Sequence, residues 1–461
     1  MSSSKDILLA RLRGGEPLSR GQQTRLTLIL AVPAILAQLS SVLMQYIDSA
    51  MVGRLGAGPA ASIGLVATCT WLFTGFAMAV MTGFSVQVAH ACGAGDFGRA
   101  RSLLAQGMFT MLVFSGFLAA VGAGISGPLP AWLGGAEEIR TEASAYFRIY
   151  SGFLPIGMTG YIASSMLQAS GNMKVPSIMY IGMCGLDVLF NYIFIYGLGM
   201  GVEGAAWGTG VAEALTSACA VWYACTRSPE LRIRGEKVSF LPSREVLRRA
   251  LGITGPLWLQ NVVMRGAYVA STLIVAPLGP VSIAANAFAI TAESFCYMPG
   301  YGLEEASTTL VGQSLGAGRE DLAKRFARTT IGMAVAMMSL LAVAMFAFAP
   351  QMMRIMSPDA EVVALGVRVL RIEAFAEAFY AVAIVGFGVC SGAGETLVPT
   401  VLNFGSMWLV RIVLALILTP VLGLVGYWIA MAVELSVRGI LFLLYVASCR
   451  WLKRWEKAHA L

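Results

Sequence analysis

Twelve long apolar stretches constrain the fold of this chain more than any other feature. A helix needs about 20 mainly apolar residues to cross the hydrocarbon core of a bilayer. Stretches of this length lie at residues 26–52, 62–90, 102–126, 145–169, 175–197, 204–225, 250–277, 284–312, 328–349, 364–391, 397–420 and 424–447. Only 12% of the residues are charged, about half the usual fraction of a soluble domain. The sequence therefore excludes an ordinary soluble enzyme and predicts an all-α membrane protein with twelve transmembrane helices.

Basic residues predict the orientation of these helices. One alternating set of connections, including both ends of the chain, holds 23 of the 32 Lys and Arg residues, whereas the opposite set holds only Arg54, Arg140 and Arg354. Cytoplasmic loops carry the excess of Lys and Arg in membrane proteins. We therefore predict cytoplasmic tails at 1–25 and 448–461, with both termini cytoplasmic and an even number of crossings.

An internal repeat predicts how the helices are grouped. Residues 223 positions apart match over most of each half: Pro33 with Pro256, Gly93-Ala94-Gly95 with Gly316-Ala317-Gly318, and Val175-Pro176 with Val398-Pro399. We predict two six-helix bundles, at 26–225 and 250–447, joined by a cytoplasmic linker at 226–249. Because six crossings are even, both halves should insert in the same direction and be related by a pseudo-two-fold axis along the membrane normal.

Asp48 is the strongest candidate for a functional acid. Gln38, Ser41, Gln45 and Asp48 follow helical spacing and form one polar stripe on the first predicted helix. No basic residue lies in the same span, and a charge inside the membrane costs several kcal/mol unless it is paired or faces water. We therefore predict that Asp48 faces the bundle interior and exchanges a proton or binds a sodium ion.

A second group of candidates lies on the fifth and sixth predicted helices. Asp187 and Asn191 are four residues apart and share a helix face, which Tyr180 extends. Thr209 and Glu213 share a face of the following helix in the same way, and a local partner for Glu213 is an equal alternative. An acid beside an amide binds a cation through oxygen atoms or shares a proton. The alternative is a polar clamp between helices.

The remaining candidates are polar side chains on predicted helix faces. We predict that a substrate cavity is lined by Gln45, Tyr180, Arg265, Glu293, Glu373, Glu377 and Tyr380. In the second half of the chain, a structural ion pair between Arg265 and one of the glutamates is an alternative of equal weight to substrate binding. Glu434 and Arg438, four residues apart, are expected to form a structural pair.

The sequence also argues against several function classes. No GxxxxGK[ST] motif is present, so ATP is not expected to drive the protein. Two histidines are too few for a His-based metal site or catalytic triad, so we do not expect an enzyme. We expect no cofactor other than H⁺ or Na⁺ as a coupling ion, no nucleic-acid partner, and a monomer.

Several motifs resemble one transporter family. They are IDSAMVGRLGAG around Asp48, GAGDFGRAR at 93–101 with its copy GAGREDLAKR at 316–325, SGNMKVPS at 170–177, LDVLFNYIFIYGLGMGVEGAAWGT at 186–209, and SGAGETLVPT at 391–400. In order and spacing, the chain resembles the multidrug and toxic compound extrusion (MATE) family across roughly residues 25–450. The resemblance implies two six-helix lobes in a bacterial cytoplasmic (inner) membrane. It also implies export of hydrophobic, often cationic compounds, coupled to inward proton or sodium flow.

The resemblance also implies roles for individual residues. The first-helix acid of the family falls on Asp48, the fifth-helix polar pair on Asp187 and Asn191, and a threonine of some members on Thr209. This chain departs from the pattern by placing an acid first in the pair. In the second lobe, the family's tenth-helix acid position falls on Tyr380, which favours coupling through the first lobe.

A lipid-linked oligosaccharide flippase with a similar plan is the alternative function. Such a protein should line its cavity with several cations that bind pyrophosphate. In this sequence only Arg265 stands clearly in the middle of a span, whereas acids are numerous. The flippase is therefore the less favoured of the two functions.

Overall fold

The computed structural model describes residues 4–236, 238–452 and 455, and within them the only regular elements are helices. Each of the twelve predicted spans contains helical residues. Some residues of the predicted tails and linker lie outside the described part of the chain, at 1–3, 237, 453–454 and 456–461.

The first half of the chain contains, in order, α1 (Ser4–Arg13), α2 (Arg20–Gly53), α3 (Ala57–Gly93), α4 (Phe97–Ile125), α5 (Leu129–Trp132), α6 (Glu137–Ala169), α7 (Lys174–Asn191), η1 (Tyr192–Gly197) and α8 (Gly201–Thr226). The second half contains α9 (Arg244–Val275), η2 (Ala276–Leu278), α10 (Pro280–Gly316), α11 (Glu320–Met356), α12 (Ala360–Glu373), α13 (Glu377–Gly392), α14 (Leu397–Gly405), η3 (Ser406–Ile412), α15 (Val413–Leu422) and α16 (Leu424–Ala447). The elements η1 and η3 are π-helical, and η2 is a 3₁₀-helix.

Length and hydropathy alone identify fewer spans than the pattern of stretches predicts. Nine helical segments of the described chain are long and apolar enough to cross a membrane, or ten if the bent pair α12 and α13 forms one span. The predicted spans at α6 and α8 are missing from this set. These two helices contain 33 and 26 residues, so at about 1.5 Å per residue both exceed the ~30 Å thickness of a hydrocarbon core.

The structure confirms the internal repeat, helix by helix. Helices α3 and α10 both contain 37 residues, and both begin after a glycine with positive φ, Gly56 at 117° and Gly279 at 89°. A side chain at either position would be strained in this backbone conformation. The same offset of 223 residues relates the first residues of α4 and α11, α6 and α12, α7 and α14, and α8 and α16.

One break distinguishes the second copy from the first. Helix α6 is continuous, but its counterpart is divided at residues 374–376 into α12 and α13, whose axes differ by 59°. The residues at the break, Ala374, Phe375 and Ala376, include neither glycine nor proline. Glycine and proline, the usual helix breakers, are therefore not its cause.

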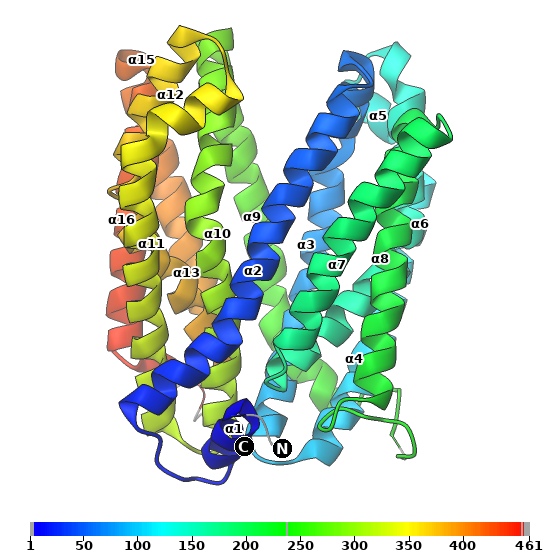
Figure 1. Cartoon of the computed structure of the whole chain (residues 1–461), viewed down its shortest axis with the longest axis vertical. Helices are drawn as coiled ribbons and strands as arrows, with labels where there is room; N and C mark the ends of the chain where they lie inside the picture. Colours follow the sequence, from blue (N-terminus) through cyan, green and yellow to red (C-terminus); the bar gives the residue numbers. More distant parts are fainter. Residues whose placement is uncertain (1–3, 237, 453–454, 456–461) are drawn as a thin grey trace. The chain divides into compact units, whose positions relative to one another are not determined.

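The helices form two compact units (Figure 1). One unit contains Leu39–Trp258, in which α6 packs against α3, α4 and α8 around buried Phe84 and Phe147. The other joins the chain up to Gln38 with the chain from Leu259 onward, and its α13 packs against α10, α11 and α16. The two boundaries between these units lie inside helices, one in α2 and the other in α9. The predicted boundaries of the bundles lie between helices.

Part of the predicted N-terminal tail is an ordered helix. Leu8, Leu9 and Leu12 of α1 are buried. The side chain of Arg13 donates a hydrogen bond to Oε1 of Gln313 on α10, with 3.3 Å between Nε and Oε1. Helix α1 therefore packs against α10 within the same unit.

Candidate functional site

Three of the predicted coupling residues meet in one hydrogen-bonded cluster. The side-chain amide of Asn191 donates to Oδ1 of Asp48 and to Oδ2 of Asp187, at 3.1 Å in each case. Asp187 is fully buried, Asn191 is 2% exposed, and Asp48 is partly buried. Thr209 of α8 lies within hydrogen-bonding reach of Asp187. We call these four residues the α2–α7–α8 cluster.

The cluster has more acceptor atoms than donors. The two N–H groups of the Asn191 amide can each serve one carboxylate. Oδ1 of Asp187 and Oδ1 of Asn191 are buried, and neither accepts a hydrogen bond from any residue that the structure describes. An unsatisfied buried acceptor costs about 1–3 kcal/mol. A proton on one carboxyl group, or a small cation between the oxygen atoms, would satisfy these acceptors.

Local backbone structure holds the cluster in place. Asp187 and Asn191 share a face of α7 because they are four residues apart. The π-helical segment η1 begins directly after Asn191, and such segments are frequent at functional sites. Within η1, the Tyr196 hydroxyl donates to the carbonyl oxygen of Met51 at 2.7 Å, which links the end of α2 to η1.

Gly208 of α8 makes room for Asn191, and this contact gives a testable prediction. A Cβ atom at Gly208 would overlap Oδ1 of Asn191 and lie 2.8 Å from its backbone nitrogen. Gly208→Ala is therefore expected to displace Asn191 and strongly reduce transport. At Gly182 of α7, an added Cβ meets no described atom within 4 Å. Gly182→Ala is expected to preserve transport and stabilise the helix by about 1 kcal/mol.

Transport by the two glycine variants, each normalised to the amount of protein in the membrane, tests this contact. Equal activity of Gly208→Ala and Gly182→Ala would show that the close approach of α8 to Asn191 is not required.

Glu213 lies outside the hydrogen-bonded cluster. The hydroxyl of Tyr161 on α6 donates to Oε1 of Glu213 at 3.2 Å. A Cβ at Gly157 of α6 would lie 3.0 Å from Oε2 of the same side chain. Of the two alternatives that the sequence left open for Glu213, the structure shows the local partner, Tyr161 of α6.

The polar stripe predicted on α2 is divided between the two units. Gln38 donates to Oε1 of Glu305 on α10 at 3.0 Å, and both residues belong to the same unit. Ser41 is buried and Gln45 is exposed, while Asp48 joins the α2–α7–α8 cluster. The stripe therefore does not act as one surface.

Two predicted cavity acids flank the break between α12 and α13. Glu373 is the last residue of α12 and Glu377 the first of α13, and both are fully buried. None of their four carboxylate oxygens accepts a hydrogen bond from the described residues. Glu293 of α10 is 5% exposed and close enough to influence both acids electrostatically.

Aromatic residues follow these acids along the same helices. The hydroxyl groups of Tyr301 and Tyr380 are 3.4 Å apart, and the rings of Tyr297 and Tyr380 have their centres 5.7 Å apart. The guanidinium group of Arg265 lies 6.0 Å from the ring centre of Tyr268. Tyr180 and Arg265 are partly buried. A substrate cavity formed by these residues stays a prediction.

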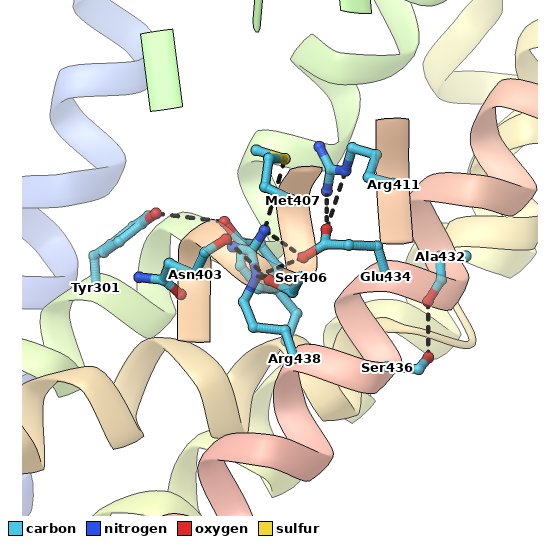
Figure 2. A network of polar contacts seen from close by, with 10 residues as sticks. Tyr301, Asn403, Ser406, Met407, Arg411, Ala432, Glu434, Ser436 and Arg438 are labelled. Carbon is cyan, nitrogen blue, oxygen red and sulfur yellow. Dashed lines mark hydrogen bonds and ion pairs between the residues drawn. The ribbon is translucent and has the colours of Figure 1, made fainter. Parts of the chain in front are cut away.

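The predicted pair of Glu434 and Arg438 is confirmed, and a third residue, Arg411, also contacts Glu434 (Figure 2). Glu434 of α16 accepts from Arg438 at 2.6 Å and from Arg411 of η3 at 2.7 Å. Glu434 is fully buried, and both arginines are 6% exposed. Arg438 also donates to Oγ of Ser406 at 3.2 Å. We call Arg411, Glu434 and Arg438 the buried ion triad.

Sequence reasoning missed Arg411, Tyr161 and Gly208. Arg411 and Arg438 both lie in the middle of predicted spans, so the statement that only Arg265 has this position is wrong. The position of Arg411 inside the apolar stretch 397–420 was a usable signal, because an arginine within a span is expected to have a polar or acidic partner in the bundle interior. Tyr161 and Gly208 give no such signal, because their roles depend on how α6, α7 and α8 pack.

Comparison with known proteins extends these observations. A family model described as MatE matches residues 33–193 and again 256–417. The two matches begin 223 residues apart, as the repeat predicts. The chain is 26% identical over 435 residues to a probable multidrug resistance protein NorM of Thermotoga maritima, covering 92% of each chain. It is 27% identical over 462 residues to the multidrug resistance protein MdtK of Yersinia pestis, covering 95% of this chain and 98% of the relative.

Solved structures share the fold. A Vibrio cholerae MATE transporter, VcmN, superimposes with a TM-score of 0.84 at 20% identity, covering 97% of this chain and 98% of that one. A transporter of the MOP superfamily from Pyrococcus furiosus superimposes with a TM-score of 0.87 at 21% identity, covering 95% and 97%. At this level of identity the likeness concerns the fold alone.

Proposed function

Since the chain belongs to the MatE family, we propose that it is a secondary antiporter that exports hydrophobic, often cationic compounds in exchange for protons or sodium ions. Two relatives that match over nearly their whole length are named multidrug resistance proteins. On this proposal the protein is a transporter and not an enzyme. It lies in the cytoplasmic membrane with both termini on the cytoplasmic side, as the distribution of Lys and Arg predicts.

The observation that carries the coupling proposal is the bridge from Asp48 through Asn191 to Asp187. Two carboxylates that share one amide in a water-poor interior repel each other when both are charged. Uptake of one proton removes that repulsion and creates an O–H donor where buried acceptors are otherwise unsatisfied. Protonation therefore changes the hydrogen bonds that join α2 to α7.

This change supplies a mechanism for coupling. Proton binding from the outside would favour one arrangement of α2 against α7 and α8, with low affinity for the substrate. Release of the proton to the cytoplasm would favour the other arrangement. The proton and the substrate then influence each other's affinity by the same factor, because binding free energies are linked reciprocally. Sodium would act in the same place through the oxygens of Asp48, Asp187, Asn191 and Thr209.

Vesicles with imposed gradients test the proposal. Purified protein is reconstituted into vesicles that are loaded with a fluorescent cationic dye. The vesicles are then exposed, in separate experiments, to a pH gradient and to a sodium gradient. We expect one of the two gradients, directed toward the side that corresponds to the cytoplasm, to drive the dye away from that side. Dye movement that responds to neither gradient would contradict antiport, and the gradient that drives it identifies the ion.

A further inference from the structure

An apolar groove lies on the surface of the unit that contains α11, α12, α13 and α16. It is an open groove with a volume of about 810 Å³. Most of its lining side chains are apolar, and the exceptions are Arg368, Arg371 and Ser436. The groove is therefore an oily surface with two positive charges.

The groove faces away from the polar interior of its unit. On α16 it is lined by Ile429, Val433 and Ile440. Glu434 and Arg438 of the buried ion triad lie on the opposite face of the same helix. Val433 is 41% exposed and Ile440 is 44% exposed. Because α11 and α16 are long and apolar enough to cross a membrane, we expect the exposed apolar side chains of α16 in the groove to face lipid.

The break in the helix shapes one wall of the groove. Ile372, Phe375 and Ala376 line it at the point where α12 turns by 59° from α13. Phe375 is 75% exposed. The continuous α6 has no equivalent break, so this wall is a feature of the second half of the chain.

The two arginines lie near one end of the span. They follow the start of α12 by 8 and 11 residues, which corresponds to about 12 and 17 Å along the axis. Helices α12 and α13 together follow a path of about 50 Å, which exceeds the ~30 Å thickness of a hydrocarbon core even after the 59° bend shortens it. Arg368 and Arg371 therefore lie close to the boundary of the core, where a long side chain reaches the headgroups.

Both guanidinium groups are exposed, and neither forms an ion pair with a described acidic residue. Arg371 is held over the ring of Phe346, 5.1 Å from its centre, and donates to the Phe346 carbonyl at 3.4 Å. No described acid neutralises these two charges, so an anion from outside the chain can do so, and guanidinium groups bind phosphate through paired hydrogen bonds.

We propose that this groove binds one anionic phospholipid, with an acyl chain along α16 and the phosphate on Arg368 and Arg371. Charge complementarity identifies the headgroup, and the apolar lining identifies the chain. A neutral lipid fits the groove but leaves the two arginines without an anion. Free phosphate fits the arginines but leaves the groove empty.

Native mass spectrometry of the purified full chain with phosphatidylglycerol or phosphatidylcholine tests the proposal. We expect one phosphatidylglycerol per chain to resist delipidation, with at least tenfold preference over phosphatidylcholine and no competition by inorganic phosphate. The double variant Arg368→Gln, Arg371→Gln should lose this preference. The control Arg354→Gln, an exposed arginine on α11 outside the groove, should keep it.

A second pair of variants tests the groove without changing its charge. Val433→Trp fills the groove and should abolish retention of the lipid. Leu443→Trp changes an exposed residue of α16 outside the groove and should not. Equal retention of the two lipids by the native chain would overturn the proposal, as would tight phosphatidylglycerol binding by the double arginine variant or by Val433→Trp.

Discussion

Replacing Asp48 by Asn is expected to reduce ion-driven efflux to the level of protein-free vesicles. Asparagine has nearly the shape of aspartate, so it can keep a hydrogen bond to Asn191, but it neither carries a negative charge nor exchanges a proton at physiological pH. Insertion and folding should therefore survive while coupling is lost. Asp187→Asn is expected to have the same effect, because Asp187 shares the amide of Asn191 with Asp48. Dye efflux from vesicles, normalised to inserted protein, measures both.

A matched control separates coupling from a general loss of negative charge. Glu203 is an exposed acid in the first turn of α8, the helix that carries Thr209. Glu203→Gln should transport at close to the native rate. Native efflux by Asp48→Asn would contradict the assigned role, and so would an equal loss in Glu203→Gln.

Glu434→Gln is expected to produce the largest loss of stability. It leaves Arg411 and Arg438 buried without the carboxylate that both contact. Removing one partner of a buried ion pair costs about 3–5 kcal/mol, a large part of the 5–15 kcal/mol that stabilises a typical domain. Thermal unfolding of the purified protein in detergent measures the effect, and failure to accumulate folded protein is its extreme form.

The chain supplies a surface pair as control. Arg101 and Glu236 are 2.7 Å apart, as close as Arg411 and Glu434, but their side chains are 20% and 46% exposed. Glu236→Gln should change stability by at most about 1 kcal/mol. A triple variant with Leu at 434 and Met at 411 and 438 should unfold at a higher temperature than Glu434→Gln. Equal stability of Glu434→Gln and Glu236→Gln would show that burial of the triad has no energetic consequence.

Much of the fold can be predicted from patterns along the sequence, namely apolar length, the internal repeat and helical spacing. Apolar length predicts the helices, because every span must satisfy its own backbone hydrogen bonds in lipid. The repeat predicts their equivalence, and the structure reproduces its offset at the starts of α3 and α10. Helical spacing places Asp187 and Asn191 on one face. Only the family resemblance connected this face with Asp48, since contact between distant helices leaves no trace in local spacing.

The features that escaped prediction depend on tertiary packing. The segment from Glu373 to Glu377 contains good helix formers, yet the helix breaks there. The π-helical segments at 192–197 and 406–412 have no local signal of this kind either. Gln38 lies on the same predicted helix stripe as Asp48, but its side chain forms a hydrogen bond with Glu305. In each case the arrangement depends on neighbouring helices far away in the sequence.

The central claim is that ion exchange at the α2–α7–α8 cluster is coupled to substrate movement. The most direct measurement applies a substrate gradient alone to reconstituted protein and records internal pH, and in a parallel experiment internal sodium. We expect the substrate to drive one ion in the opposite direction through the native protein, and no ion movement through Asp48→Asn or Asp187→Asn. Substrate movement without either ion, or ion movement that persists in both variants, would contradict the claim.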